Sequence, residues 1–362
     1  DDMKNILVTG GCGFIGNNFI RRLFEHYKFD GVVVNIDRLT YPNSIIGLQD
    51  IAQQYPDQYH FVHGNITDFN LITSLLQDYK IDTIINFAAE SHVDKSLYNL
   101  SPFIDSNIVG TITLLDAIRK VDINIRFHQV STDECWGSLG AIGYFNESSP
   151  YKPRNPYAAS KASADLFVQA YYHTYNCAVT VSNCSNNYGP YQFPEKLIPL
   201  VILRILQQQE IPIYGTGTNI REWIYVNDHC DAIWKIVNDG KIGLSYAIGG
   251  GYEIDNISLV NRIIAIMAKF GYTTIEKATS LITFISDRLG HDFRYAVSRK
   301  QMLYNFSWEP QVSFSQGLAD TIKWYVEHQE WCQKVMSSEY EEWIKLNYMN
   351  RGNAHVENHS SK

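Results

Sequence analysis

The sequence predicts an α/β protein: a doubly wound parallel sheet, followed by a smaller C-terminal α/β domain. Short apolar runs at residues 5–9, 32–36 and 82–87 alternate with amphipathic segments of helical length. A glycine-rich turn at residues 10–16 follows the first run, and turn residues become frequent after residue 188. Strands that alternate with helices assemble into parallel sheets, because each crossover helix returns the chain to the same edge.

The first strand, turn and helix carry the signature of a dinucleotide-binding (Rossmann) fold. The run at 5–9 leads into GGCGFIG at residues 10–16, and the run at 32–36 ends in Asp37. Glycines let the backbone approach a pyrophosphate, and the helix that follows presents its N–H groups. Asp37 stands where an acid accepts hydrogen bonds from the adenosine ribose hydroxyls. The acid favours NAD over NADP by repelling a 2′-phosphate, although the neighbouring Arg38 means that the sequence does not exclude NADP.

Further strands are expected at residues 59–63, 82–87 and 178–183, and a helix at 107–120. The loops after these strands meet the same sheet edge as the glycine turn, so they supply further cofactor contacts. The predicted cofactor-binding residues are Gly10, Gly13, Phe14, Ile15, Gly16, Asp37, Asn65, Ile66, Ala88, Ala89, Tyr157 and Lys161.

Groups that handle protons follow the fifth predicted strand. Thr132 ends that strand and Asp133-Glu134 come directly after it. Tyr157 and Lys161 are four residues apart, so they share one face of a helix. The lysine charge favours the phenolate, which suits a base acting on an alcohol. Each pair alone is more often an ordinary surface feature; downstream of a dinucleotide signature, the set predicts a catalytic site.

The chain is expected to divide into a cofactor domain at residues 1–188, with a returning segment near 224–250, and a mainly substrate-binding domain at 189–347. Helices at about 195–209, 258–270 and 315–328 belong to the second domain. The polar tail at 348–362 is expected to be flexible.

Composition excludes several classes of function. The 362 residues carry a formal net charge of −8 and no basic stripe, which argues against nucleic acid as a partner. No apolar run reaches membrane-spanning length. The six cysteines form no CxxC and no metal-ligand spacing, so we expect no metal site and reduced thiols in the cytoplasm.

Motifs along nearly the whole chain resemble those of the extended short-chain dehydrogenase/reductases, and within them the dTDP-glucose 4,6-dehydratases. They are TGGCGFIG (9–16), FAAESHVDKS (87–96), STDE (131–134), PYAASK (156–161), CSNNYGPYQFPEKLIP (184–199), PIYG (212–215), IREW (220–223), DRLGHD (287–292) and WIKLNY (343–348). The Thr-Asp-Glu triplet is the specific feature, since related sugar-nucleotide epimerases lack the acidic pair at this point.

The resemblance implies an NAD-dependent lyase that converts a nucleotide sugar to its 4-keto-6-deoxy form. Tyr157 would take the proton of the sugar C4 hydroxyl, to which Thr132 hydrogen-bonds. Lys161 would lower the tyrosine pKa and hold the nicotinamide ribose. Glu134 would remove the C5 hydrogen that the ketone acidifies, and Asp133 would protonate the hydroxide that leaves C6. Hydride would return to C6, which regenerates the cofactor.

The resemblance also implies a substrate site and a homodimer formed through helices of the cofactor domain. The expected substrate-binding residues are Ser91, His92, Thr132, Asn187, Glu195, Lys196, Leu197, Pro212, Tyr214, Arg221, Asn256, Arg288 and His291. Departures from the family pattern are Cys12, Asn65, Cys135-Trp136 and Leu289. Of these, Trp136 is expected to reshape the floor of the pocket.

Three alternatives stay open at this point. A UDP-glucose 4,6-dehydratase has identical chemistry, and thymine differs from uracil by one methyl, worth only about 1–3 kcal/mol. A UDP-hexose 4-epimerase is disfavoured, because it leaves a second carboxyl such as Asp133 idle. A non-catalytic dinucleotide-binding protein is disfavoured because Tyr157, Lys161 and both carboxyls are present.

Overall fold

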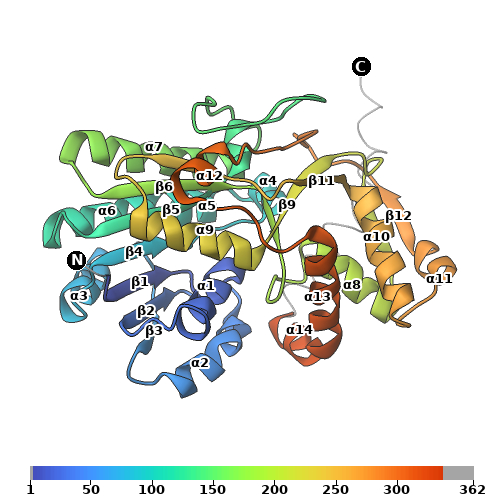
Figure 1. Ribbon diagram of the computed structural model, residues 1–362, viewed down its shortest axis with the longest axis horizontal. Helices are drawn as coiled ribbons and strands as arrows, with labels where there is room; N and C mark the ends of the chain where they lie inside the picture. The colour runs from blue at the N-terminus through green and yellow to red at the C-terminus, as the bar shows by residue number, and fades with distance from the viewer. Residues whose placement is uncertain (1–2, 337–362) are drawn as a thin grey trace.

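The computed structural model describes residues 3–336, and its centre is a seven-stranded parallel sheet with the order β10-β6-β5-β4-β1-β2-β3 (Figure 1). The strands are β1 (Asn5–Thr9), β2 (Val32–Asp37), β3 (Tyr59–His63), β4 (Thr83–Asn86), β5 (Arg126–Thr132), β6 (Val179–Cys184) and β10 (Ser245–Ile248). The chain runs outward from β1 to β3 and then crosses to β4, on the other side of β1. This reversal leaves a crevice at the carboxyl ends of β1 and β4, where doubly wound sheets bind ligands.

Helices cover both faces of this sheet, which explains why its strands are apolar throughout. Ile6 and Val8 pack toward α1 (Phe14–Glu25) and α9 (Val226–Asp239). Leu7, between them, faces the opposite side, where α3 (Phe69–Asp78), α6 (Gly110–Val121) and α7 (Pro156–Tyr175) pack. Successive side chains of a strand point to opposite faces, so a run of apolar residues buries both.

Local signals place α7, the helix that carries Tyr157 and Lys161. The Asn155 side chain caps α7 by accepting a hydrogen bond of 2.8 Å from the Ala158 backbone N–H, and Pro156 fills the first helical position. Proline suits that position because its missing N–H would have no partner there. The helix ends at Tyr175, and the C-cap residue Asn176 takes the left-handed conformation. Tyr157 therefore lies in the first turn, beside the end of β5.

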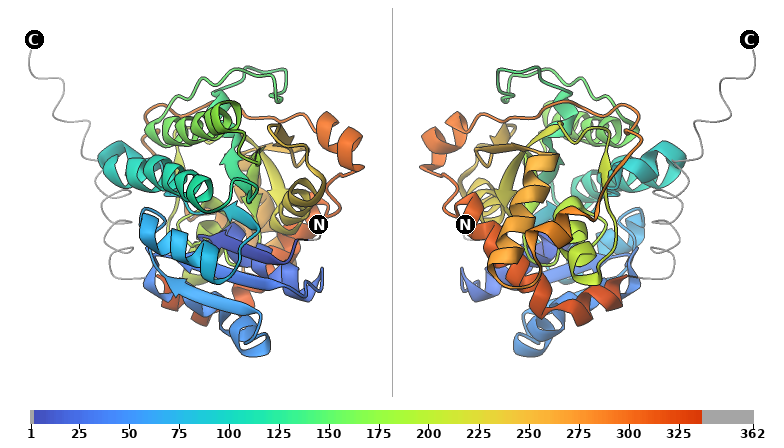
Figure 2. Two further views of the ribbon diagram at one scale, coloured as in Figure 1. Left: turned by 90° about the vertical axis from the view of Figure 1, so that its left-hand side faces the viewer. Right: turned by 90° about the vertical axis from the view of Figure 1, so that its right-hand side faces the viewer.

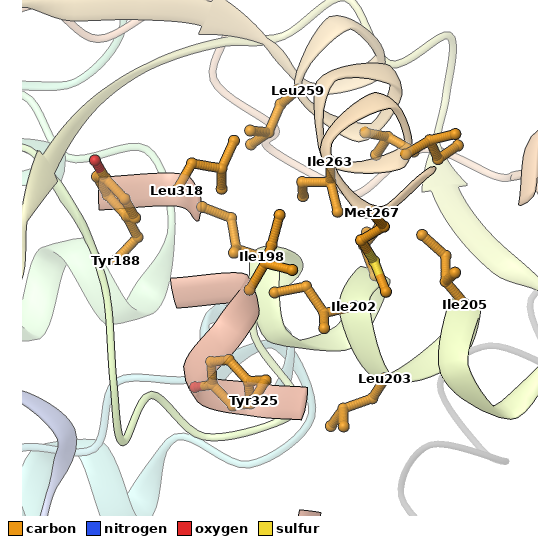
Figure 3. Packing of buried hydrophobic residues seen from close by; sticks show 14 of the residues in the cluster. Tyr188, Ile198, Ile202, Leu203, Ile205, Leu259, Ile263, Met267, Leu318 and Tyr325 are labelled. Atoms are coloured by element: carbon orange, nitrogen blue, oxygen red, sulfur yellow. The ribbon is translucent and has the colours of Figure 1, made fainter. Parts of the chain in front are cut away.

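The remainder of the chain builds a second layer around a separate core. It contains a three-stranded sheet of β7 (Asn186–Tyr188), β9 (Ile220–Tyr225) and β11 (Tyr252–Asp255), and a two-stranded sheet of β8 (Ile211–Tyr214) and β12 (Ile282–Ile285). The apolar faces of α8 (Leu197–Gln207), α10 (Asn256–Lys269) and α13 (Phe314–Glu327) meet through side chains such as Ile202, Ile263 and Leu318 (Figure 3). This core holds the second layer beside the crevice.

The remaining elements are short. They are η1 (Pro42–Leu48), α2 (Gln49–Gln54), α4 (Val93–Tyr98), α5 (Ser101–Phe103), η2 (Ile104–Val109), η3 (Asp133–Trp136), α11 (Ile275–Thr279), α12 (Lys300–Phe306) and α14 (Gln329–Val335). Among residues 3–336, no helix is both long and apolar enough to cross a membrane.

The predicted fold class is confirmed, with one change of detail in the cofactor domain. The helix expected at 107–120 begins as a π-helical turn, η2, and continues as α6 to Val121. The chain returns to the large sheet through α9 and β10, and α12 also packs against these two elements. We propose a domain boundary near residue 188 with this return. The WIKLNY motif, the end of the proposed second domain (337–347) and the tail lie outside the described residues.

Candidate active site

A cavity of about 330 Å³ opens at the crevice and brings together most of the predicted site residues. This volume is in the range of small-molecule sites. The predicted residues that line it are Gly10, Gly13, Phe14, Ile15, Gly16, Asp37, Asn65, Ile66, Ala88, Ala89, Ser91, His92, Thr132, Asp133, Glu134, Tyr157, Lys161, Asn187, Glu195 and Lys196.

The glycine turn fits a pyrophosphate because side chains have no room there. A Cβ on Gly10 would lie 2.6 Å from the Ala88 Cα, and one on Gly16 would lie 2.6 Å from the Gly10 carbonyl oxygen. Gly10 also has a φ of 68°, which favours glycine. The turn leaves the N-terminal end of α1 at the cavity, where helix N–H groups bind anions.

Asp37 is oriented by two backbone donors. Its carboxylate accepts hydrogen bonds from the Cys12 N–H at 3.0 Å and the Leu39 N–H at 2.8 Å. Arg38 pairs with Glu90 and donates to the Thr40 hydroxyl at 2.9 Å, so its charge is already engaged. This arrangement fits a ribose with free hydroxyls better than one with a 2′-phosphate.

The acidic pair stands at the carboxyl end of β5. The Thr132 hydroxyl accepts a hydrogen bond from the Glu134 N–H and donates to Asp133 Oδ1, both at 3.3 Å. Asn155 donates to Glu134 Oε2, also at 3.3 Å. Asp133 Oδ2 is buried and has no hydrogen-bond partner in the described structure. A polar atom buried in this way at a cavity wall suits contact with a ligand.

The two carboxyls differ in their electrostatic surroundings. The pKa of Asp133 is raised well above its usual range by burial and by the charges of Glu134 and Glu222. Burial also raises the pKa of Glu134, but Arg221 and the Asn155 hydrogen bond oppose the rise. Asp133 is therefore the better proton donor and Glu134 the better proton acceptor.

Tyr157 and Lys161 share the expected helix face, and burial dominates the electrostatics of the phenol. The pKa of Tyr157 is raised well above its usual value by burial, and the nearby Glu134 adds to the rise. The Lys161 ammonium donates to the Val130 carbonyl oxygen at 2.8 Å. Removal of a phenolate from water disfavours the charged form, and the sequence spacing does not reveal how deeply the phenol is buried.

The cavity lining also contains Tyr41, a residue that sequence reasoning missed. The Tyr41 hydroxyl donates to Glu195 Oε2 at 2.8 Å, and the Tyr41 ring stacks on Phe193 with centroids 4.5 Å apart. Lys95 lies 3.7 Å from the same Glu195 oxygen, and Lys196 donates to the Ser91 carbonyl at 3.0 Å. The only sequence signal for Tyr41 is its position four residues after Asp37.

The other predicted substrate residues stand behind the cavity lining or beyond it: Leu197, Pro212, Tyr214, Arg221, Asn256, Arg288 and His291. Arg288 makes a bidentate ion pair with Asp94, at 2.7 and 3.0 Å, and Tyr214 donates to Asp94 at 2.9 Å. His291 pairs with Asp287 at 2.7 Å. Both Arg221 and Arg288 lower the pKa of Glu134, so their charges act on the cavity.

Leu197, Pro212 and Asn256 lie in helices and a strand of the second layer and do not line the cavity. Leu197 and Asn256 begin α8 and α10, and Pro212 lies in β8. Trp136 packs against Phe145, with ring centroids 5.5 Å apart. It does not line the cavity, although it was expected to reshape the pocket floor. Residues 3–336 contain no cluster of three His, Cys, Asp or Glu side chains arranged to hold a metal ion.

Comparison with known proteins places this site in a family. The model of the GDP-mannose 4,6 dehydratase family matches residues 7–321. A dTDP-glucose 4,6-dehydratase from Xanthomonas campestris pv. campestris (strain B100) is 44% identical over 351 residues, which cover 93% of this chain and 97% of the relative. A dTDP-glucose 4,6-dehydratase from Salmonella typhimurium is 42% identical, over 96% of this chain and 99% of the relative.

The chain belongs to this dehydratase family. Solved structures of the family have the same fold. A dTDP-glucose 4,6-dehydratase from Bacillus anthracis in complex with NAD has a TM-score of 0.83 and 42% identity, covering 92% of this chain and 99% of that one. One from Streptomyces venezuelae, with NAD and TYD bound, has a TM-score of 0.83 and 39% identity, covering 91% and 99%. A UDP-glucose 4-epimerase from Thermotoga maritima, 23% identical with a TM-score of 0.80, shares the fold alone.

Proposed function

We propose that this protein is an NAD-dependent dTDP-glucose 4,6-dehydratase, which forms dTDP-4-keto-6-deoxyglucose and water. The observation that carries the proposal is the acidic pair Asp133-Glu134, which shares one cavity with Tyr157, Lys161 and the glycine turn. An epimerase has no step that uses both carboxyls, whereas elimination of water needs a base and an acid. The 39–44% identity with dehydratases of this name supports the same conclusion.

NAD fits the cavity. Gly10, Gly13 and Gly16 would hold its pyrophosphate, Asp37 its adenosine ribose, and Lys161 its nicotinamide ribose. When bound, NAD supplies the acceptor for hydride from the sugar C4 and the donor that returns hydride to C6. The chain's own residues do the remaining work, which is proton transfer and orientation.

The first chemical task is removal of the proton from the C4 hydroxyl. Tyr157 is the base, and Thr132, at the end of β5, orients the C4 oxygen by hydrogen bonding. Because burial raises the pKa of Tyr157, the phenol needs the positive charge of Lys161 nearby to release its own proton. The two side chains share the inner face of α7, which keeps this pair together.

The second task is elimination across C5 and C6. Glu134 accepts the C5 proton, which the ketone at C4 has made acidic. Asp133, whose pKa is raised well above its usual range by burial and by neighbouring carboxylates, gives its proton to the departing C6 hydroxyl, so that water leaves. The carboxyl whose pKa is raised more strongly thus gives the proton, and the one stabilised by Arg221 and Asn155 accepts it.

Mass analysis of the products tests the function. The pure protein is incubated with dTDP-glucose or UDP-glucose, with and without added NAD. We expect dTDP-glucose to lose one water and to yield a 4-keto product. Faster turnover of UDP-glucose would show that the uridine nucleotide is the preferred substrate. Formation of an isomeric nucleotide sugar without loss of water would indicate an epimerase.

We further propose a cytoplasmic homodimer. Apolar side chains on η2 and α7 are exposed, including Ile104 and Val109 at 41% and Leu166 at 60%. In Figure 2, α6 and α7 lie side by side on one face of the molecule. Because η2 and α7 contact each other, apolar side chains exposed on both suit an interaction site. Sedimentation should give a dimer for the wild type and a monomer for Leu166→Glu; a monomeric wild type would contradict the assignment.

The proposed location in the cytoplasm is supported by the six buried free thiols, which suit a reducing compartment.

A further inference from the structure

A buried carboxylate that the proposed chemistry does not use lies directly behind the catalytic residues. Tyr157, Lys161 and Asp165 follow one another at intervals of four along α7, and their exposed fractions are 8%, 4% and 1%. They therefore form one row on the inner face of the helix. A carboxylate is almost never buried to this extent unless it is paired.

Donors from several segments converge on a single oxygen of this carboxylate, Asp165 Oδ2. The Ser131 hydroxyl donates at 2.6 Å, the Tyr151 hydroxyl at 2.9 Å and the Asn183 amide at 3.1 Å. The Cys135 thiol approaches the same oxygen at 3.8 Å. Such a set of donors matches an ionised carboxylate, since hydrogen bonds from several donors favour the charged form.

These contacts join the segments that carry the active site. Ser131 precedes Thr132 on β5, and Cys135 follows Glu134 in η3. Asn183, on β6, also donates to the Thr132 carbonyl oxygen at 3.0 Å. Asp165 thus links the end of β5, the turn with both carboxyls and the helix with Tyr157.

Asp165 is also the main counter-charge of Lys161. Burial lowers the pKa of the Lys161 ammonium, and the Asp165 charge is the largest effect that opposes the lowering. The other titratable groups that act on Lys161 are the thiols of Cys135 and Cys184. Burial raises the pKa of Asp165, and the Lys161 charge together with the hydrogen bonds from Ser131, Tyr151 and Asn183 opposes the rise. A buried lysine without its counter-charge gives up its proton more readily.

We propose that Asp165 is a positioning residue for the oxidation step, which fixes the end of β5 against α7 and keeps Lys161 cationic. The inference rests on the proposed function, because it assigns a task to the same Tyr157-Lys161 pair. Asp165 acts through Lys161 and Ser131 and does not itself contact the substrate.

The test compares pH profiles of kcat and of NAD affinity in the wild type, Asp165→Asn and Tyr151→Phe. Asp165→Asn removes the charge with little change of shape, whereas Tyr151→Phe removes one donor to the same oxygen and no charge. We expect kcat of Asp165→Asn to fall at least tenfold and its alkaline limb to move toward neutral pH by roughly one pH unit. The limb of Tyr151→Phe should stay at the wild-type position. A folded Asp165→Asn variant with the wild-type limb would overturn the proposal.

A second pair of variants keeps the test decisive if Asp165→Asn does not fold. Asp165→Glu retains the charge and should retain the wild-type limb, while Asp165→Gln should show the shift; equal limbs would refute the inference. NAD affinity, followed by fluorescence, does not depend on turnover of the sugar. A wild type that binds NAD but forms no 4-keto product would contradict the proposed function alone. The pH profiles of NAD affinity in the wild type and the Asp165 variants would then still test the role of Asp165.

Discussion

The ion pair between Asp94 and Arg288 should be a strong contributor to stability, because it joins α4 to a loop 194 residues away with almost no exposure of the carboxylate. Burial raises the pKa of Asp94, but Arg288, His92 and the Tyr214 hydroxyl outweigh it and lower the pKa from 3.8 to about 2. Each pKa unit corresponds to about 1.4 kcal/mol, so Asp94 ionisation favours the folded state by about 2 kcal/mol at neutral pH. We expect Asp94→Asn to lower the free energy of unfolding by roughly this amount.

The pH dependence follows from the sign of the shift. A carboxyl whose pKa is lowered in the folded state stabilises fully above its unfolded pKa, 3.8, and loses this effect as the pH falls toward 2. The difference between the wild type and Asp94→Asn should therefore be constant from about pH 5 to 8 and should shrink below about pH 4. Urea unfolding followed by tryptophan fluorescence measures it.

Asp116→Asn is the matched control. Asp116 pairs with Arg119 at 3.1 Å, but the two side chains are 41% and 37% exposed. Exposed pairs contribute at most about 1 kcal/mol, because water and salt screen them. If Asp94→Asn destabilised the protein no more than Asp116→Asn does, the reasoning from burial and bidentate geometry would be refuted.

Three further predictions concern the chemistry. Tyr157→Phe should lower the rate of C4 oxidation by about 10²–10⁴-fold with near-normal NAD binding, since it removes the base; single-turnover absorbance of NADH measures this, and an unchanged rate would exclude Tyr157 as the base. Glu134→Gln should still permit C4 oxidation but should block exchange of the C5 hydrogen with solvent deuterium, as followed by NMR; normal exchange would assign the base elsewhere. Asp37→Ala should weaken NAD binding by roughly 10–100-fold, because a charged hydrogen bond contributes about 1.5–3 kcal/mol. A dissociation constant equal to that of the wild type would show that another group binds the ribose.

Interactions close in the chain could be predicted from the sequence. The strand at 5–9, the glycine turn and Asp37 form one local unit, whose geometry follows from the small size of glycine and the length of a βαβ element. The spacing of Tyr157 and Lys161 places both on one helix face wherever the helix packs. The order of strands and helices follows from hydrophobic periodicity, and for this reason the fold class was predictable.

Tertiary structure alone decided the charges of the site and the partners of its arginines. The pKa of Tyr157 depends on how deeply the phenol is buried and on Glu134, neither of which the helical spacing reveals. The pairing of Arg288 with Asp94, the stacking of Tyr41 on Phe193, and the convergence of three segments on Asp165 join residues that are far apart in the chain. Burial and long-range contacts arise only when the layers pack together, so the sequence determined which groups are present and the packing determined which of them keep or lose a proton.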